Sequence, residues 1–297
     1  MRAILTTRYG APDVLEVGEL ATPRPGPGQI RIDVELAGVG PTDLAIRAGR
    51  LTAAFPLAPG GVLGFEAAGT VGAVGPGVTD AAVGDAVAAF LPGLGGYAES
   101  VLADLWVPKP AGVAWADAAA LPASGEAAAR VLDHLGVEPG ETLLVLGGAG
   151  AVGTIATQLA VAAGVRVIAT VRGEDFAAVE RLGAVPVDYT APLAAITGRV
   201  DAVLDATGRS DLEAAVRLAG GPQRVVTLSD HRGPGLGVVL SGPDPVHARA
   251  RLQRAMTALA GGTLALRPHV ERPLGAAARV HAELEQGELR AKVLLRP

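Results

Sequence analysis

The first part of the chain, up to about residue 115, alternates short apolar stretches with breaks rich in Gly and Pro. Turn clusters such as Pro-Arg-Pro-Gly-Pro-Gly at 23–28 and Gly-Pro-Gly at 75–77 bound these stretches, as expected of strands joined by tight turns. The predicted strands are Val14–Leu20, Gln29–Leu36, Gly69–Val74 and Asp85–Ala89. Short strands at this spacing favour a compact antiparallel barrel.

From about residue 116 the pattern changes to long Ala-rich helical stretches that alternate with apolar strands. The predicted helices are Ser124–Leu135, Val152–Ala163, Asp175–Leu182 and Pro245–Leu259, and the predicted strands are Thr142–Leu146, Arg166–Val171 and Ala202–Asp205. This alternation predicts a doubly wound parallel sheet with helices on both faces, which places the chain in the α/β class.

The tail of the chain returns to apolar segments of strand length, Leu264–Val270 and Lys292–Leu295. We expect this tail to rejoin the first domain. The predicted organisation is therefore an antiparallel domain of residues 1–115, rejoined by 268–297, and a parallel-sheet domain of residues 116–267.

Composition narrows the classes of function. The chain has 297 residues, of which 49% are hydrophobic and 19% charged, and this balance excludes intrinsic disorder. A formal charge of −5 argues against a nucleic acid or an anionic membrane surface as partner. Because the chain has no cysteine, disulfides, thiolate zinc sites, iron–sulfur clusters and a cysteine nucleophile are excluded. Lys109 and Lys292 are the two lysines among 25 basic residues, a bias that we attribute to a GC-rich bacterial coding sequence.

One stretch without charged residues, from Thr142 to Val165, is long enough to span a bilayer. This stretch contains Gly-Gly-Ala-Gly-Ala-Val-Gly at 147–153, where four glycines in seven residues favour a tight turn over a membrane helix. The N-terminal apolar run breaks at Arg8 and is too short for the core of a signal peptide. We therefore expect no membrane association and a cytoplasmic location.

The same glycine cluster fits the pattern G-x-G-x-x-G through Gly148, Gly150 and Gly153. In a chain with 41 glycines the pattern alone is weak. Here, however, it follows a predicted strand and begins a predicted helix within a βαβ unit, as in dinucleotide-binding folds. Gly148 would permit the tight turn, Gly150 would let a pyrophosphate approach the backbone, and Gly153 would let the helix pack on the strand. The N–H groups at the helix N-terminus would bind phosphate. The alternative is an ordinary glycine-rich βα turn.

The end of the next predicted strand bears on which dinucleotide binds. An NAD site has a carboxylate about 20 residues after the first glycine. This chain has Thr170, Val171 and Arg172 there, and no carboxylate before Glu174. Arg172 could instead pair with the 2′-phosphate of NADP(H), so the sequence favours NADPH as cofactor. The alternative for Arg172 is a solvated loop residue.

Ten further motifs occur in a fixed order: YGAPDVL at 9–15, GVGPTD at 38–43, LGFEAAG at 63–69, VGDAV at 83–87, GYAE at 96–99, AALP at 119–122, PGET at 139–142, LGA at 182–184, VDAVLDATG at 200–208 and RAKVLL at 290–295. In this order the chain resembles the zinc-independent quinone oxidoreductases of the medium-chain dehydrogenase/reductase family, which include enone and enoyl-thioester reductases. The resemblance runs nearly end to end. It implies a GroES-like barrel interrupted in sequence by a Rossmann domain, a small-molecule substrate and a homodimer.

The resemblance also implies three groups of cofactor-binding positions. The pyrophosphate loop would comprise Gly148, Gly150, Ala151, Val152 and Gly153. The adenosine end would be bound by Thr170, Arg172 and Tyr189, and the nicotinamide end by Thr207 and Ser229. Each of these residues could instead have an ordinary structural role at a turn or strand end, and Tyr189 could be a core residue.

The chain departs from the family at several positions near the site. Zinc-dependent relatives have Cys and His where this chain has Gly40 and Phe65, so we expect no metal. The quinone reductases usually carry Asn at the position of Gly40, and some carry Tyr at that of Ala45. A family Lys that assists 2′-phosphate binding is replaced by Phe176, which leaves Arg172 to act alone.

Hydride transfer from NADPH needs no protein nucleophile, so the candidate catalytic residues are donors of a proton to the product oxyanion or enolate, or residues that line the substrate pocket. These candidates are Asp43, Tyr97, Ser124 and His231. The alternatives are hydrogen bonding within the barrel for Asp43 and Glu66, a helix N-cap for Ser124 and a surface loop for His231.

The sequence therefore predicts a zinc-independent, NADPH-dependent oxidoreductase that acts on a quinone or an activated C=C bond of an enone or enoyl compound. Two alternatives stay open, because the usual Asn and Tyr are absent. One is a biosynthetic family member that catalyses dehydration or cyclisation in the same cleft. The other is a non-catalytic NADPH-binding protein.

Overall fold

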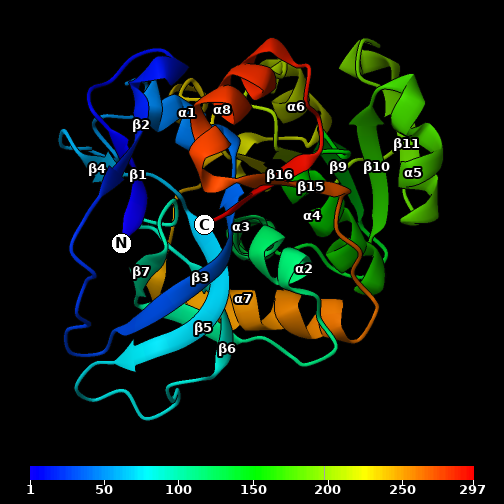
Figure 1. Cartoon of the computed structure of the whole chain (residues 1–297). Helices are drawn as coiled ribbons and strands as arrows, with labels where there is room; N and C mark the ends of the chain where they lie inside the picture. The colour runs from blue at the N-terminus through cyan, green and yellow to red at the C-terminus, as the bar shows by residue number, and fades with distance from the viewer. Residues whose placement is uncertain (197) are drawn as a thin grey trace. The chain divides into compact units, whose positions relative to one another are not determined.

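The computed structural model describes residues 1–196 and 198–297 (Figure 1). It divides into two compact units, the first formed by Met1–Ala123 with Pro268–Pro297 and the second by Ser124–Arg267. The expected transition at residue 115 lies inside the first unit, because helix α2 (Trp115–Ala120) packs on strands of that unit. Within the described ranges, none of the helices combines the length and apolar character needed to cross a membrane.

The first unit contains two sheets. The smaller has the strand order β2-β1-β4, and the larger has the order β15-β16-β3-β5-β6-β8, with β7 also paired to β3. The strands are β1 (Arg2–Thr6), β2 (Leu15–Glu19), β3 (Ile30–Val39), β4 (Gly61–Val62), β5 (Glu66–Val74), β6 (Ala86–Phe90), β7 (Ser100–Ala103), β8 (Leu105–Pro108), β15 (His269–Pro273) and β16 (Lys292–Arg296). In the described part of this unit the strands pair antiparallel, except for β15 with β16, which are parallel. The four strands predicted in this part of the chain are confirmed, with ends that agree within three residues.

Strand β3 organises the larger sheet. Its residues Ile30 and Ile32 are fully buried while Asp33 is exposed, which is the period-two pattern of a strand with one face in the core. It pairs with β5 and also with β7 and β16. Because β16 comes from the end of the chain, the tail belongs to the first unit. That unit also contains the helices α1 (Pro41–Arg47), α2 and α8 (Ala277–Gln286).

The predicted strand Leu264–Val270 is wrong except at its end, because β15 begins only at His269. The Ala265 N–H donates to the side-chain oxygen of Gln158 at 2.8 Å, and the Ala265 carbonyl accepts from the Gln158 amide nitrogen at 2.8 Å. These backbone groups therefore bond to a helix side chain rather than to a strand. Pro268 has no N–H to give to a ladder.

The second unit contains a six-stranded parallel sheet with the order β11-β10-β9-β12-β13-β14. Its strands are β9 (Thr142–Leu146), β10 (Arg166–Val171), β11 (Val185–Asp188), β12 (Ala202–Asp205), β13 (Val225–Thr227) and β14 (Val239–Leu240). The predicted bounds of β9, β10 and β12 are confirmed residue for residue. Every residue of β9 and β12 is buried, which explains why these strands are unbroken apolar runs.

The helices of the second unit are α3 (Pro122–Leu135), which begins at the end of the first unit, α4 (Ala151–Ala162), α5 (Phe176–Arg181), α6 (Leu212–Leu218) and α7 (Pro245–Ala260). The four predicted helices all occur, with ends that agree within two residues. The doubly wound α/β class predicted from the sequence is thus confirmed.

The strand order creates a switch point beside β9. From β9 the chain adds β10 and β11 on one side of the sheet, then returns to add β12, β13 and β14 on the other side. In parallel sheets wound in this order, ligands bind outside the carboxyl ends of the strands at the switch point. The loops that follow β9, β10, β12 and β13 are therefore the place to look for a site.

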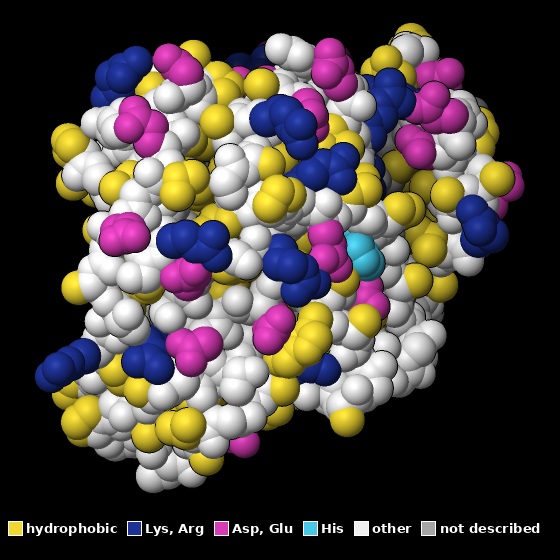
Figure 2. Space-filling view, viewed as in Figure 1, with side chains coloured by type: hydrophobic (Ala, Val, Ile, Leu, Met, Phe, Trp, Pro, Cys, Tyr) yellow, Lys and Arg dark blue, Asp and Glu magenta, His cyan; other side chains and the backbone are white. Residues whose placement is uncertain are grey.

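The surface charge is mixed rather than segregated. On the face that Figure 2 shows, Lys and Arg side chains are interspersed with Asp and Glu. This pattern and the formal charge of −5 do not provide the broad basic surface that a nucleic-acid backbone requires on that face.

Candidate functional site

The turn after β9 is held against the end of β10. Gly147 has a φ of +86°, a left-handed conformation that favours glycine. Its N–H donates to the carbonyl oxygen of Thr170 at 3.3 Å and to the Thr170 hydroxyl at 3.2 Å. The Gly148 N–H also donates to the Thr170 carbonyl, at 3.1 Å. The tight turn expected at Gly148 is thus made by Gly147, and Thr170 supports that turn.

Close packing requires glycine at two further positions of the turn. A Cβ on Gly148 would lie 2.5 Å from the Cβ of Ala169, and a Cβ on Gly153 would lie 2.3 Å from the carbonyl oxygen of Gly147. Gly150 is less crowded, since a Cβ there would meet only the Gly147 oxygen, at 3.1 Å. The turn therefore packs tightly against the sheet, and Gly150 is the least crowded of these three positions.

Helix α4 begins directly after this turn. Its N-cap, Gly150, has an extended backbone and no side chain that could cap the helix. The first-turn N–H groups of Ala151, Val152 and Gly153 therefore have neither an intrahelical partner nor a side-chain cap. They add to the positive end of the dipole of a 12-residue helix. The residues present fit the pyrophosphate of a dinucleotide.

An exposed cation and an exposed aromatic ring follow β10 and β11. The side chain of Arg172 is 50% exposed, and its Nη1 lies 3.9 Å from Oε1 of Glu174. Tyr189 is 59% exposed, so its alternative as a core residue is wrong. Because Val171 pairs with Asp188, Arg172 and Tyr189 are the next residues on two adjacent parallel strands. The two side chains therefore belong to the same part of the carboxyl edge.

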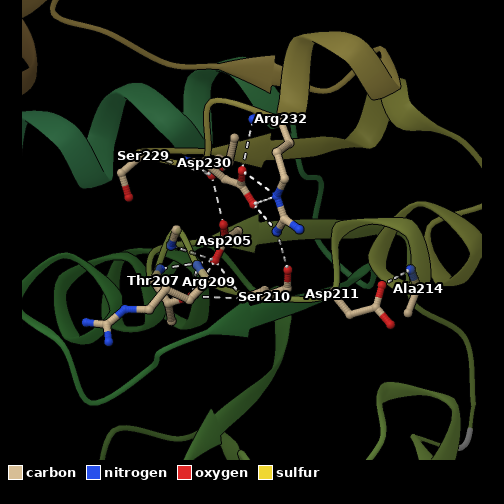
Figure 3. Close-up of polar contacts among 11 residues, drawn as sticks. Asp205, Thr207, Arg209, Ser210, Asp211, Ala214, Ser229, Asp230 and Arg232 are labelled. Carbon is tan, nitrogen blue, oxygen red and sulfur yellow. Dashed lines mark hydrogen bonds and ion pairs between the residues drawn. The ribbon is translucent and has the colours of Figure 1, made fainter. Parts of the chain in front are cut away.

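The loops after β12 and β13 approach each other (Figure 3). Thr207 and Ser229 lie on these loops, and both are exposed. Gly208 has a φ of +68°, and a Cβ there would lie 2.1 Å from Oγ of Ser229. A Cβ on Gly147 would lie 2.6 Å from Cγ2 of Thr207. The structure thus brings Thr207 and Ser229 together beside the turn after β9.

Sequence reasoning missed Asp205, the last residue of β12. Its side chain is fully buried and accepts hydrogen bonds from the hydroxyls of Thr207, Ser210 and Thr227 at 2.8, 2.7 and 2.8 Å (Figure 3). A signal was present in the sequence, because a carboxylate that ends a wholly apolar strand is costly to bury unless nearby donors satisfy it.

Asp43 lies in the interior of the first unit, with 1% of its surface exposed. Its two carboxyl oxygens accept hydrogen bonds from the N–H groups of Gly40, at 2.8 Å, and Gly64, at 3.0 Å. Burial raises the pKa of this carboxyl from 3.8 to about 7, against the lowering effect of these hydrogen bonds and of the nearby Lys292 charge.

Tyr97 and His281 form a buried pair in the same unit. The Tyr97 hydroxyl lies 3.2 Å from Nε2 of His281, and neither side chain is exposed. Burial, together with the charge of Asp43, raises the pKa of Tyr97, and burial lowers the pKa of His281 to about 3. Both groups are therefore neutral at pH 7. The sequence analysis did not identify α8, the helix that carries His281.

Glu66 is engaged on both carboxyl oxygens. Oε1 forms an ion pair with Nζ of Lys292, which also donates to the Val39 carbonyl at 3.1 Å, and Oε2 accepts the N–H of Ala123 at 2.8 Å. These contacts connect β16, β3 and β5 with the start of α3. A structural role within the first unit explains the positions of Asp43 and Glu66.

The two other candidate catalytic residues differ in exposure. Ser124 is buried, and because α3 begins at Pro122 its alternative role as N-cap is wrong. His231 is exposed on the loop after β13. It lies between Asp230 and Arg232, whose side chains form an ion pair at 2.6 Å.

Comparison with known proteins gives matches in both units. Residues 26–111 match the family model for the alcohol dehydrogenase GroES-like domain, and residues 151–234 match that for zinc-binding dehydrogenase. The chain is 34% identical over 225 residues to 2-haloacrylate reductase of Burkholderia sp., with 71% of this chain and 68% of that protein covered. It is 35% identical over 181 residues to quinone oxidoreductase of Rattus norvegicus, with 59% of this chain covered. The chain spans about half (54%) of the length of that rat protein.

A solved mycobacterial structure, complexed with NADPH, matches with a TM-score of 0.84 and 29% identity over the full length of both chains. These matches show that the chain belongs to the medium-chain dehydrogenase/reductase family, in the group of the quinone oxidoreductases. The first unit is its GroES-like domain and the second its Rossmann-like domain.

Gly40 and Phe65, from which the sequence analysis expects no metal, make other contacts in the structure. The N–H of Gly40 binds Asp43, and the ring of Phe65 packs against Phe55 and Phe90, with centroid distances of 5.1 and 6.5 Å. Among residues 1–196 and 198–297, no group of three or more His, Asp or Glu side chains is arranged to hold a metal ion.

The packing of the glycine turn predicts the effect of Gly153→Ala. Helix propensity alone favours Ala by about 1 kcal/mol, but the new Cβ would overlap the Gly147 oxygen, and overpacking of this kind costs about 1–3 kcal/mol. We expect a net loss of stability in urea denaturation. Gly242→Ala is the control, because a Cβ there meets nothing within 4 Å. Equal stability of the two variants would contradict the proposed packing constraint.

The raised pKa of Asp43 predicts a pH-dependent stability. An acid whose pKa is higher in the folded than in the unfolded chain stabilises the fold below about pH 4, and this contribution is lost as the pH rises through 7. The free energy of unfolding of the wild type, relative to Asp43→Asn, should therefore fall by about 2–3 kcal/mol between pH 5 and pH 8. Denaturation at several pH values measures this difference. Asp13→Asn, at a side chain that is 71% exposed, controls for the loss of one negative charge. A wild-type advantage that is constant over the pH range would show that Asp43 does not titrate in this window.

Proposed function

We propose that this protein is an NADPH-dependent oxidoreductase that transfers a hydride to a quinone or to an activated C=C bond of a small molecule, without zinc. The main support is that the glycine turn, the uncapped N-terminus of α4 and Arg172 occur together at one edge of the parallel sheet. NADPH supplies the hydride when it is bound, and the chain supplies binding, orientation and exclusion of water.

The proposed binding residues follow the order of the strands. Ala151, Val152 and Gly153 offer their N–H groups to the pyrophosphate, while Gly148 and Gly150 keep the turn close to the sheet and accessible. On the far side of β9, the loops after β12 and β13 bind the nicotinamide end through Thr207 and Ser229 (Figure 3). Family membership and the NADPH complex of the mycobacterial relative support this assignment.

NADPH is proposed over NADH because of the end of β10. Arg172 provides a guanidinium that can bind a 2′-phosphate, and Tyr189 places an exposed ring next to it. The carboxylate that would hold a 2′-hydroxyl at the end of β10 is replaced by Val171 and Arg172. Thr170 contributes indirectly, through its support of the turn at Gly147.

The substrate class follows from the relatives, whose names describe the reduction of a quinone and of a 2-haloacrylate. Both names point to an electron-poor unsaturated acceptor. The reduced product then takes up a proton, which water can supply. Asp43, Tyr97 and Ser124 are buried and His231 is an exposed loop residue, so the proposal does not depend on a protein proton donor.

We also propose that the protein is a homodimer and is located in the cytoplasm. The edge strand β14 of the parallel sheet, with Val239 37% exposed, supports an assembly in which two sheets join at their edges. Light scattering of the purified protein measures the mass in solution, and a monomer at micromolar concentration would contradict the dimer.

The first test of the function is consumption of NADPH with a panel of acceptors. We expect the absorbance of reduced nicotinamide to fall when a quinone, an α,β-unsaturated ketone or a 2-haloacrylate is added, and not in the absence of an acceptor. Binding of NADPH without its oxidation across the panel would exclude the redox activity. Disappearance of a substrate without consumption of NADPH would instead identify a non-redox enzyme.

The second test is Arg172→Ala. Loss of charge-assisted hydrogen bonds to a 2′-phosphate should cost about 1.5–3 kcal/mol of NADPH binding, which is roughly a 10- to 150-fold higher dissociation constant. Binding of NADH should be almost unchanged. Arg166→Ala is the matched control, because Arg166 is exposed at the opposite end of the same strand. Equal weakening of NADPH and NADH binding would contradict the role of Arg172 in coenzyme choice.

A further inference from the structure

The carboxylate of Asp205 is enclosed by donors from the loop after β12 and from Thr227, the last residue of β13 (Figure 3). Its Oδ1 accepts hydrogen bonds from the hydroxyl and N–H of Thr207, the N–H of Gly208 and the hydroxyl of Ser210, at 2.8, 3.1, 3.2 and 2.7 Å. Its Oδ2 accepts from the hydroxyl of Thr227 at 2.8 Å. The side chain is 0% exposed. Hydrogen bonds from this loop and from the end of β13 thus offset the cost of burying the carboxylate.

These contacts close into a ring. The Thr227 hydroxyl also accepts the N–H of Asp230 at 3.1 Å. The Asp230 carboxylate binds the guanidinium of Arg232 at 2.6 Å, and that guanidinium donates to the carbonyl oxygen of Ser210 at 3.1 Å. Ser210 in turn donates to Asp205. We name Asp205, Ser210, Thr227, Asp230 and Arg232 the Asp205 ring.

The ring fixes both loops on which Thr207 and Ser229 lie. A Cβ on Gly208 would be 2.1 Å from Ser229 Oγ, so the two loops touch at this point. Thr207 also lies against Gly147, because a Cβ on Gly147 would be 2.6 Å from Thr207 Cγ2. A change within the ring would therefore move Thr207 and Ser229 relative to the glycine turn.

The ring lies on one half of the sheet only. Arg172 and Tyr189 follow β10 and β11, on the other side of β9 from β12 and β13. In dinucleotide-binding sheets each half binds one mononucleotide. The contacts of the Asp205 ring therefore concern one end of the coenzyme and leave the adenosine end to other residues.

We propose that Asp205 is a positioning residue for the nicotinamide end of the coenzyme, which it reaches only through the loops that carry Thr207 and Ser229. This inference rests on the proposed function. Asp205 touches neither coenzyme nor substrate in this role. Instead it preorganises the two loops, so that their conformations do not have to be ordered when the coenzyme binds.

The test compares a whole coenzyme with its adenosine half. Thr227→Val removes the hydroxyl at nearly constant shape, Thr227→Ser retains it, and Asp205→Asn replaces one acceptor by a donor. We expect Thr227→Val and Asp205→Asn to raise the dissociation constant of NADPH about tenfold or more, measured by calorimetry. The dissociation constant of 2′,5′-ADP should change less than twofold. Thr227→Ser should resemble the wild type.

Asp211→Asn is the matched control, because Asp211 lies on the same loop but outside the ring. Its carboxylate caps α6 by accepting the N–H of Ala214 at 2.9 Å, which Asn can also do. Thermal unfolding of each variant identifies loss of fold, and a variant that is unfolded at the assay temperature is replaced by Ser210→Ala, which removes one donor of the ring.

The outcomes separate this inference from the proposed function. Suppose that the wild type binds both compounds and that the variants are folded. If the dissociation constants of NADPH and 2′,5′-ADP then rise by the same factor, or if neither rises, the positioning role is overturned and the proposed function stands. A wild type that binds neither compound would overturn both. Selective loss of NADPH binding, restored in Thr227→Ser, supports the role of Asp205.

Discussion

Contact between backbone atoms at the glycine turn determines the geometry of the second unit's carboxyl edge. The start of α4 lies so close to the preceding turn that a Cβ on Gly153 would be 2.3 Å from the Gly147 oxygen. With no side chain between them, α4 cannot shift relative to β9 without breaking these contacts. The N–H groups of its first turn consequently point to one fixed place, and a phosphate there would be bound without reorganisation of the protein.

Two buried carboxylates show how the number of nearby donors decides the role of an acid. Asp43 has two backbone donors, and burial raises its pKa to about 7, so that it can be neutral in the folded chain near physiological pH. Asp205 is equally buried but faces five donors from residues 207–227. Because those donors come from the loop after β12 and from the end of β13, the cost of burying this carboxylate is offset only when that loop adopts one conformation against β13. The free-energy cost of burying the Asp205 carboxylate thereby restricts the conformation of the chain around it.

The sequence was sufficient to predict an element where the pattern that indicates it lies within that element's own residues. Thr142–Leu146 could be predicted because a parallel strand buried on both faces is an unbroken apolar run. The predicted strand from Leu264 failed because apolar content does not reveal that Gln158, 107 positions earlier, takes the hydrogen bonds of Ala265. The pattern of glycines located the turn but could not decide that Gly147 adopts the left-handed conformation. The role of Asp205 depends on Thr227, which is 22 positions away and meets it only once β12 and β13 have paired.

The charges around Arg172 bear on the role in coenzyme choice that we propose for it. It pairs with Glu174, at 3.9 Å, and both side chains are at least half exposed. Exposed pairs of this kind contribute little, because water and salt screen them. A 2′-phosphate carries more negative charge than a carboxylate and offers several acceptor oxygens to the planar guanidinium. In the proposed complex, Arg172 would therefore gain more from the phosphate than it would lose from Glu174. Asp175, the next acid in this turn, is offset by the charge of Arg267, whose own pKa burial lowers. In the proposed complex, preference for the phosphorylated coenzyme would therefore come from one side chain rather than from a broad positive surface.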